Sequence, residues 1–513
     1  MTLLSRILGL VREQVRAHFL GTGWASDAYG IATLIPNLFR RLLAEGAMTA
    51  AFIPVFVEYM HGDKKHETQA FLSKFLTLLT LVAAAVTVLG ILSTGWIIDT
   101  FFAGRFQEVP GKVELTIALT EWMWPYLFFV TLAAVLQAIL NAHKVFGPSA
   151  FTPVLLNLAI IGCAVAFRDT FDDPAFGFIL GFLVGGLVQI AFQVPYLLKH
   201  TELKLRFDFR IKHPGVRRVI FIMIPGVFAA GIYQINVLVS QIIAAGLEGG
   251  SIASLQYSVR LQELVLGLFV VSIAQVILPT LAEQTAKNDT AAVKSTLRHA
   301  TGLMAFVTLP ATAGLILIGP EVIALLFQYG EFDATSTEMT SFALTFHAVG
   351  LFAIAATRVF QQVFYAYKDM KTPTLAAFVV LIANVILCLL LSVPLSHGGI
   401  ALAGSIAAAI NGLLLLFYLR RKIGSLGGRT MVIQFIKVTL ATLLMTAAVL
   451  GFEFLWAAPG VEERVLLGIW ILSTVVFASV VYVLASKILR INELSELIGA
   501  LRHRGKHAPG KSE

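Results

Sequence analysis

Charged side chains lie within apolar stretches of this sequence, where their cost suggests a function. Six of them are candidate substrate-binding residues: Arg6, Arg12, Glu13, Asp27, Arg40 and Arg260. A charge at the centre of a bilayer costs roughly 2.5–3.5 kcal/mol on insertion scales. The planar fork of arginine binds two phosphate oxygens at once. An excess of arginine over carboxylate therefore predicts a cationic cavity for an anionic cargo that carries phosphate.

Additional charges could line the same cavity or neutralise one another. They are Arg41, Glu45, Glu263 and Arg358. On a helix Arg41 faces Glu45 and Arg260 faces Glu263, because residues three or four apart are neighbours. Arg16 and Asp27 lie near the ends of apolar stretches, from which they could snorkel to the interface. A purely structural role for each pair stays open, but it does not explain the excess of arginine.

Motifs for enzyme chemistry are absent from the sequence. It contains no G-x-x-x-x-G-K-[ST] loop, no H-E-x-x-H and no cysteine cluster, so we expect no nucleotide site, no metal and no cofactor. The histidines are scattered without metal-ligand spacing, and Cys163 and Cys388 both lie in apolar runs. We therefore expect a transporter rather than an enzyme.

The composition is that of a membrane protein. Of 513 residues, 58% are hydrophobic and only 13% are charged, whereas a soluble protein carries about 25% charged residues. The net charge of +8 would suit nucleic acid, but basic cytoplasmic loops explain it, so no nucleic-acid partner is expected. The apolar N-terminal stretch is interrupted by Arg6, Arg12, Glu13 and Arg16, so it is not a cleaved signal peptide.

Apolar runs of about 20 residues recur, each long enough to cross the bilayer as a helix. They predict an all-α polytopic protein with about fourteen spans. The expected spans are 2–20, 28–59, 70–103, 117–142, 148–167, 175–198, 219–245, 252–282, 300–328, 338–366, 373–394, 398–419, 431–456 and 465–486.

Basic residues gather in alternate loops. One set of loops, including 199–218, is rich in Lys and Arg, while the other set holds few. By the positive-inside rule the basic set is cytoplasmic. The count of spans is then even and both termini are cytoplasmic.

The sequence also repeats itself. V-L-Q-A-I-L-N-A-H-K at 135–144 parallels V-F-Q-Q-V-F-Y-A-Y-K at 359–368, and Ser26 to Pro54 parallels Ser251 to Pro279. The offset is 224 or 225 residues, six helices, so the halves share one orientation and bind substrate between them. The expected parts are an N-terminal lobe 1–200, a C-terminal lobe 201–422, two extra helices in 423–490 and a basic cytoplasmic tail 491–513.

Several motifs resemble one family over nearly the whole chain. They are S-R-I-L-G-L-V-R-E at 5–13, P-N-L-F-R-R-L-L-A-E-G-A at 36–47 and Q-Y-S-V-R-L-Q-E at 256–263. The sequence is similar to the MurJ (MviN) family of lipid II flippases, in the superfamily of MATE-like exporters. The resemblance implies two six-helix lobes in a V with a pseudo-two-fold axis, and two further helices forming a groove for the lipid tail.

The resemblance also implies the cargo. That cargo is lipid II, the undecaprenyl-diphosphate-linked precursor of peptidoglycan, whose flipping serves cell-wall biogenesis and cell shape. Arg6, Arg12 and Arg260 match arginines of the family that are essential, and Asp27 and Arg40 match its second-helix acid and arginine. Membrane lipids and the cell-wall synthesis machinery are the other expected partners. Coupling is expected to membrane potential or to an ion.

Three alternative functions stay open at this point. Another polyprenyl-linked glycan or a drug could be the cargo, although a cationic drug would require carboxylates rather than arginines. A membrane-embedded transferase would require acidic metal-binding motifs, which the sequence lacks. A scaffold would not account for arginines within apolar spans.

Overall fold

The computed structural model describes residues 2–43, 47–62, 65–202 and 204–494. Secondary structure in these ranges is helical throughout, without a strand. This confirms the predicted all-α class. Helices satisfy their own backbone hydrogen bonds, which an apolar chain in lipid must do because no water is available there.

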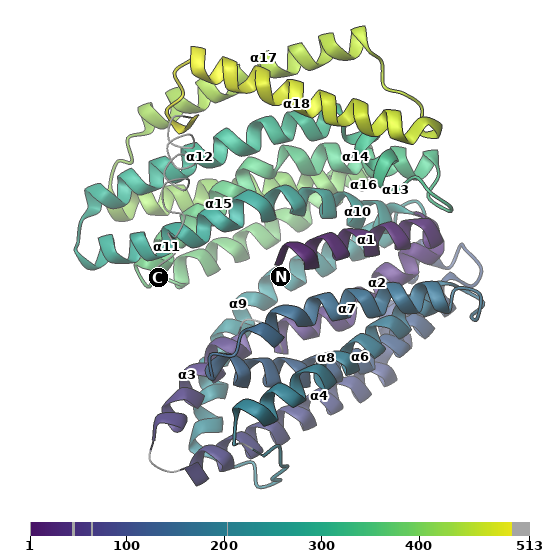
Figure 1. The fold of residues 1–513 in the computed structure, drawn as a ribbon, viewed down its shortest axis with the longest axis vertical. Coiled ribbons are helices and arrows are strands. Elements are labelled where there is room, and N and C mark those ends of the chain that lie inside the picture. The colour runs from purple at the N-terminus through teal and green to yellow at the C-terminus, as the bar shows by residue number, and fades with distance from the viewer. Residues whose placement is uncertain (1, 44–46, 63–64, 203, 495–513) are drawn as a thin grey trace, which may run out of the picture. The chain divides into compact units, whose positions relative to one another are not determined.

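The first compact unit comprises residues 1–253 together with 329–336. Its helices, drawn in purple to teal in Figure 1, are α1 (Thr2–Leu20), α2 (Trp24–Leu43), α3 (Ala47–His61), α4 (Lys65–Phe101), α5 (Ala103–Phe106), α6 (Lys112–Ala142), α7 (Gly147–Ala166), α8 (Ala175–His200) and α9 (Pro214–Ala245). The helix α9 packs on α2, α3 and α4. By its contacts it groups with this unit. The predicted lobe boundary at 200/201 stays a prediction.

The second compact unit comprises residues 254–328 and 337–513. Its elements are α10 (Ser251–Val265), the π-helical turn Leu266–Val270, α11 (Val271–Ala286), α12 (Thr290–Leu317), α13 (Gly319–Phe327), α14 (Ala334–Val349), α15 (Leu351–Ala366), α16 (Lys371–Ile423), α17 (Gly428–Leu455), the 3-10 turn Val461–Glu463 and α18 (Arg464–Ile488). Within this unit α17 and α18 pack along each other, and α17 also packs on α12 (Figure 1).

Nine of the described helices are long and apolar enough to span a membrane, or ten if the bent pair α14 and α15 is one span. The 53-residue helix α16 is interrupted at Ser396, where φ is 48°, between the two spans predicted at 373–394 and 398–419. The predicted total of fourteen stays a prediction. The chain is a multi-pass membrane protein.

Two predicted span boundaries are corrected. Residues 300–328 are not one helix, because α12 ends at Leu317 and Pro320 opens the separate helix α13. The helix α12 also begins ten residues earlier than predicted, since the Asp289 side chain accepts a hydrogen bond from the amide of Ala292 and caps it. The span predicted at 28–59 corresponds to α2 and α3, on either side of residues 44–46.

The repeat is visible in two helix ends. Lys144 and Lys368 both have positive φ, 62° and 57°. The amide of Val145 donates to the carbonyl of Leu140, and the amide of Asp369 donates to that of Phe364, both at 2.9 Å. The same helix end therefore occurs twice, 224 residues apart, which supports an internal duplication.

Candidate functional site

Two arginines of α1 share one carboxylate inside the first unit. Arg12 Nη2 donates to Glu13 Oε1 at 2.6 Å, and Arg16 Nη1 lies 3.6 Å from Glu13 Oε2. Arg12 Nη1 also donates to Asn157 Oδ1 of α7 at 3.1 Å. Because two guanidinium groups share one carboxylate, these three residues carry one net positive charge. The predicted cationic cavity stays a prediction, to which this cluster is relevant.

Arg16 is enclosed by its own unit. Its Nη2 donates to the carbonyl and hydroxyl oxygens of Ser26 at 3.2 and 3.1 Å, and its guanidinium lies 4.8 Å from the centre of the Tyr29 ring. Its side chain is only 5% exposed. The alternative that Arg16 snorkels to the interface is therefore wrong, because α2 supplies the acceptors that water would otherwise provide.

Arg12 differs from Arg16 in keeping part of its surface open. Its side chain is 17% exposed while that of Glu13 is 7% exposed. An anion could approach Arg12 without displacing Asn157 or Glu13, since a guanidinium offers five donors. Arg12 therefore keeps the more accessible guanidinium of the cluster, whereas Arg16 contacts Glu13 and Ser26 of α2 and is enclosed.

The other predicted residues of α1 and α2 do not join this cluster in the described contacts. Arg6 is exposed and no hydrogen bond or ion pair to a described residue is found for it. Arg40 donates from Nε to Asn37 Oδ1 at 2.9 Å on its own helix, and Arg41 is exposed. Glu45 lies outside the described residues, so its pairing with Arg41 stays a prediction.

Asp27 of α2 is buried, and its carboxylate contacts the start of α6 and the start of α10. Its Oδ2 accepts from Lys112 Nζ at 2.9 Å and from the amide of Gly250 at 2.8 Å, and its Oδ1 accepts from the amide of Ala253 at 3.0 Å. A carboxylate at a helix N-terminus stabilises free amide groups there. Asp27 is 1% exposed, so it too does not snorkel. In this structure it positions the start of α10.

In the second unit, Arg260 Nη1 donates to Glu263 Oε2 at 2.9 Å, one turn along α10. The two side chains are 47% and 50% exposed. Arg358 lies on α15 and is half-buried. The pair predicted from spacing is thus present, but it is open rather than enclosed.

Two residues of the site were missed in the sequence. Asn157 of α7 holds Arg12. Lys112 lies before the span predicted at 117–142, but it is the first residue of α6, and its 3% exposed side chain pairs with Asp27. Asn157 ends the motif F-T-P-V-L-L-N and is a lone polar side chain in an apolar run, a signal that could have suggested it. The described residues contain no group of three or more potential metal ligands.

The family model described as "Lipid II flippase MurJ" matches residues 16–470. The chain belongs to the MurJ family. Among curated members it is 34% identical over 484 residues to a probable lipid II flippase of Vibrio cholerae, covering 91% of this chain and 90% of that one. It is 32% identical over 425 residues to the lipid II flippase of Burkholderia cenocepacia, covering 82% of each.

Solved structures agree with this assignment. A MurJ lipid II flippase in an inward closed conformation matches with a TM-score of 0.79 and 29% identity, over 95% of this chain and 97% of that one. An inward-facing MATE multidrug transporter matches with a TM-score of 0.70 at 15% identity, over 82% and 95%. At that identity the MATE likeness concerns the fold alone. The family consists of transporters, not enzymes.

Proposed function

We propose that this protein flips lipid II from the cytoplasmic to the periplasmic leaflet of the bacterial inner membrane by alternating access. The observation that carries the proposal is the cluster around Arg12: a net positive, partly open arginine site inside an apolar protein. The similar proteins are named as lipid II flippases, which agrees with it. A lipid-linked diphosphate is an anionic cargo that fits both the charge of the Arg12 cluster and the function of the similar proteins.

The arginines would bind the diphosphate. Arg12 offers the part of its guanidinium that Asn157 and Glu13 leave free, and bidentate pairs of arginine with phosphate oxygens are among the stronger hydrogen bonds in proteins. Arg6, Arg40 and Arg260 are proposed as further contacts to the head group, and Arg41, Glu45, Glu263 and Arg358 as additional charges. The polyprenyl tail would stay in lipid, guided by the helices in 423–490.

A flippase or exporter of another cargo is the alternative. A different polyprenyl-linked glycan would present the same diphosphate, so the Arg12 site does not discriminate against it. A cationic drug would be repelled, because the cluster carries net positive charge. Depleting the protein and identifying the lipid-linked intermediate that accumulates discriminates between these cargoes. Lipid II should accumulate, and accumulation of another polyprenyl-linked glycan would instead support the alternative.

The orientation is part of the proposal. With both termini cytoplasmic, single cysteines at Glu248, Asp333 and Glu462 should react with an impermeant reagent added outside. Cysteines at Lys65, Lys204 and Arg421 should not react until the membrane is permeabilised. External labelling at Lys204 would overturn the orientation.

Membrane potential is the proposed driving force for the return stroke. A net positive empty site would be drawn toward the negative cytoplasmic side, and moving one charge through 100 mV is worth about 2.3 kcal/mol. The test measures the accessibility of a cysteine beside Arg260 in vesicles, under an imposed potential and under a sodium gradient alone. A shift with sodium but not with potential would contradict the proposal.

A further inference from the structure

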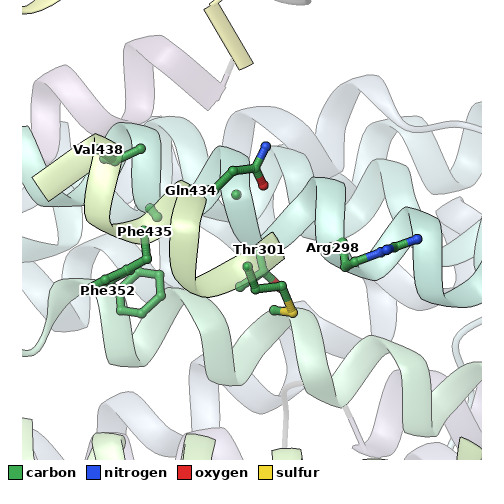
Figure 2. Close-up of a pocket in the computed structure, with 9 residues that line it drawn as sticks. Arg298, Thr301, Phe352, Gln434, Phe435 and Val438 are labelled. Carbon is green, nitrogen blue, oxygen red and sulfur yellow. The ribbon is translucent and has the colours of Figure 1, made fainter. Parts of the chain in front are cut away.

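The pocket of the second unit that lies between α12, α15 and α17 is too small for a ligand. Phe352 and Phe435 lie at one end of it and Arg298 lies toward the other (Figure 2). The space inside has room for about one water molecule. A further ligand is therefore expected on an exposed surface, and the segment between α8 and α9 of the first unit offers one.

Charged and apolar side chains alternate strictly along residues 204–212. The charged positions are Lys204, Arg206, Asp208, Arg210 and Lys212, and the apolar positions between them are Leu205, Phe207, Phe209 and Ile211. The segment contains no helix, and Thr201 and His213 on either side of it have extended backbone. Successive side chains of an extended chain point to opposite sides, so the segment has a charged face and an apolar face.

Side chains of α4 hold this segment in place. Gln69 Nε2 donates to the carbonyl of Lys204 at 2.6 Å, and Gln69 Oε1 accepts from the amide of the same residue at 2.9 Å. Further along α4, Thr77 Oγ1 accepts from the amide of Asp208 at 2.8 Å. Eight helical residues span about 12 Å and four extended residues span about 13 Å. The segment therefore lies lengthwise along α4.

The chain bends directly after the contact with Thr77 and then returns along α4. The bend is at Phe209, where the Asp208 Oδ1 accepts from the amide of Arg210 at 3.0 Å. The ring centre of His213 lies 5.7 Å from that of Phe71, which precedes Thr77 on α4. The bend is therefore the point of the segment that lies furthest along the helix.

The bend lies where α4 enters the apolar part of the bilayer. After Lys74 the next charged residue of α4 is Asp99, so the uncharged stretch 75–98 spans about 36 Å, enough for a hydrocarbon core of about 30 Å. Thr77 lies in the first turn of this stretch, and Leu81 begins the apolar side chains that α4 exposes. The segment therefore reaches the level of the lipid head groups.

Both faces of the segment are exposed at this level. Phe207 and Phe209 are 59% and 74% exposed, and Leu205 and Ile211 are each 38% exposed. The four basic side chains are exposed as well, and no ion pair with a described residue is found for them. With Asp208 as its single acid, the segment carries a net charge of +3. Aromatic and basic side chains together are typical of the boundary between lipid and water.

We propose that residues 204–212 form an interfacial anchor that binds anionic phospholipids of the bilayer. The basic side chains contact the phosphate groups of lipids with net negative charge, as basic clusters beside a membrane helix do. Phe207 and Phe209 lie among the acyl chains of the same lipids. The level of the segment on α4 favours lipid over a soluble acidic partner, and the anchor is independent of the cargo that the protein moves.

The test measures which lipid lies beside the segment in vesicles that contain the full-length chain. The vesicles hold equal amounts of phosphatidylglycerol and phosphatidylcholine, with bromine on the acyl chains of one lipid and then of the other. A fluorophore is attached to Leu205→Cys, in a chain where Cys163→Ser and Cys388→Ala remove the native thiols. Brominated phosphatidylglycerol should quench more strongly, with a local preference of about five-fold, the contribution of one basic residue near an anionic surface.

The same fluorophore on Val88→Cys is the control position. Val88 is 54% exposed on α4 and lies in the uncharged stretch, about 16 Å beyond Thr77, so both brominated lipids should quench it equally. Equal quenching by the two lipids at Leu205→Cys would overturn the selectivity for anionic lipid. Quenching by neither lipid there would overturn the interfacial position and would instead favour a soluble partner.

Variants of the charged face locate the phosphate contacts. Arg206→Gln combined with Arg210→Gln should remove most of the preference for phosphatidylglycerol. The matched control removes two exposed basic side chains elsewhere, Lys287→Gln and Lys371→Gln, and should keep the preference at the same net charge. A preference that persists in the first double variant, or that is lost equally in the control, would contradict the assignment.

Variants of the apolar face distinguish lipid phosphate from free phosphate. Phe207→Ser combined with Phe209→Ser should reduce quenching of the fluorophore at Leu205→Cys by both brominated lipids, because the segment then loses its contacts with acyl chains. Inorganic phosphate added to the wild-type vesicles should not displace the lipid. Unchanged quenching in the double variant, or displacement by inorganic phosphate, would contradict binding of a lipid.

Discussion

The helices α1 and α10 each carry an arginine and a glutamate three residues apart, but the two pairs differ in their surroundings. On α1, Arg12 and Arg16 are held by Glu13, Asn157 and Ser26 at side-chain exposures of 17% and 5%. On α10, Arg260 pairs with Glu263 of its own helix, and both side chains are about half exposed. Contacts with neighbouring helices therefore hold the charged side chains of α1, whereas the pair on α10 is about half exposed.

This difference in exposure separates residues expected to bind substrate from residues that position other side chains. A buried ion pair is held strongly, and removing one partner costs about 3–5 kcal/mol, whereas an exposed pair is worth about 0–1 kcal/mol. Substitutions on α1 should therefore divide into those that affect folding and those that affect transport. Substitutions on α10 should affect transport alone.

The largest effect is expected at Arg12. Arg12→Ala should abolish complementation of a flippase-depleted strain at normal protein levels, because Glu13 keeps Arg16 as its partner. Arg12→Lys should rescue poorly, since a point charge replaces a two-donor fork. Complementation is scored beside Arg168→Ala, an exposed arginine paired with Asp169, which should support growth. Full growth with Arg12→Ala would remove Arg12 from the site.

A similar loss of function is expected at Arg260, but for an open pair. Arg260→Ala should abolish complementation while changing the free energy of unfolding by less than about 1 kcal/mol. Arg218→Ala breaks another exposed arginine–glutamate pair, with Glu58, and serves as the control that keeps function. If both variants complement equally, the α10 pair has only a structural role.

A loss of stability is expected at Arg16. Arg16→Met keeps the volume but leaves the Ser26 acceptors and half of Glu13 without a donor, which should cost about 3–5 kcal/mol. Thermal unfolding of the purified protein measures this loss, and the amount of protein in the membrane should fall with it. A variant as stable as wild type would show that the enclosure of Arg16 is not what holds α1 to α2.

The smallest effect is expected at the repeated helix end. Asp369 accepts from Lys422 Nζ at 2.6 Å and from Thr372 N at 3.1 Å, whereas the equivalent position in the first copy is Val145. Partial burial raises the pKa of Asp369, but the bonds from Lys422 and Thr372 outweigh it and hold the pKa below its usual value. Asp369→Asn should cost about 1 kcal/mol.

The same group predicts a pH dependence. Because the pKa of Asp369 is lowered by folding, its contribution is complete above the ordinary carboxyl pKa of about 3.9. It is lost as pH falls through the lowered value. Unfolding measured across this range should show the difference between wild type and Asp369→Asn shrinking toward acid pH. Asp172→Asn, at an exposed loop carboxyl, should show no such trend.

Much of the fold could be predicted from the sequence because helix length and repeat offset are local quantities. The apolar runs located the helices, and the offset of 224 matched two helix ends with Lys144 and Lys368 at positive φ. The break between α12 and α13 was missed because the residues on both sides of it are apolar. The hydropathy of the sequence therefore does not reveal that a new helix begins beside Pro320. The number of spans stays a prediction.

The charged site was predicted only in part. Helical spacing brings Arg260 to Glu263 and Arg12 to Arg16, since residues three or four apart are neighbours on any helix. It does not reveal which residue of another helix completes the site. Asn157 and Lys112 contact Arg12 and Asp27 across 145 and 85 residues, and packing alone decides such contacts.

The most direct test of the account is the movement of lipid II itself. Cells that depend on this protein are exposed to an external enzyme that cleaves lipid II only from the outer face, and the cleaved fraction is measured after rapid inactivation of the protein. We predict that cleavage continues with active protein, and that it falls to background on inactivation and in Arg12→Ala. Cleavage that persists unchanged after inactivation, with no other flippase present, would contradict the proposed function.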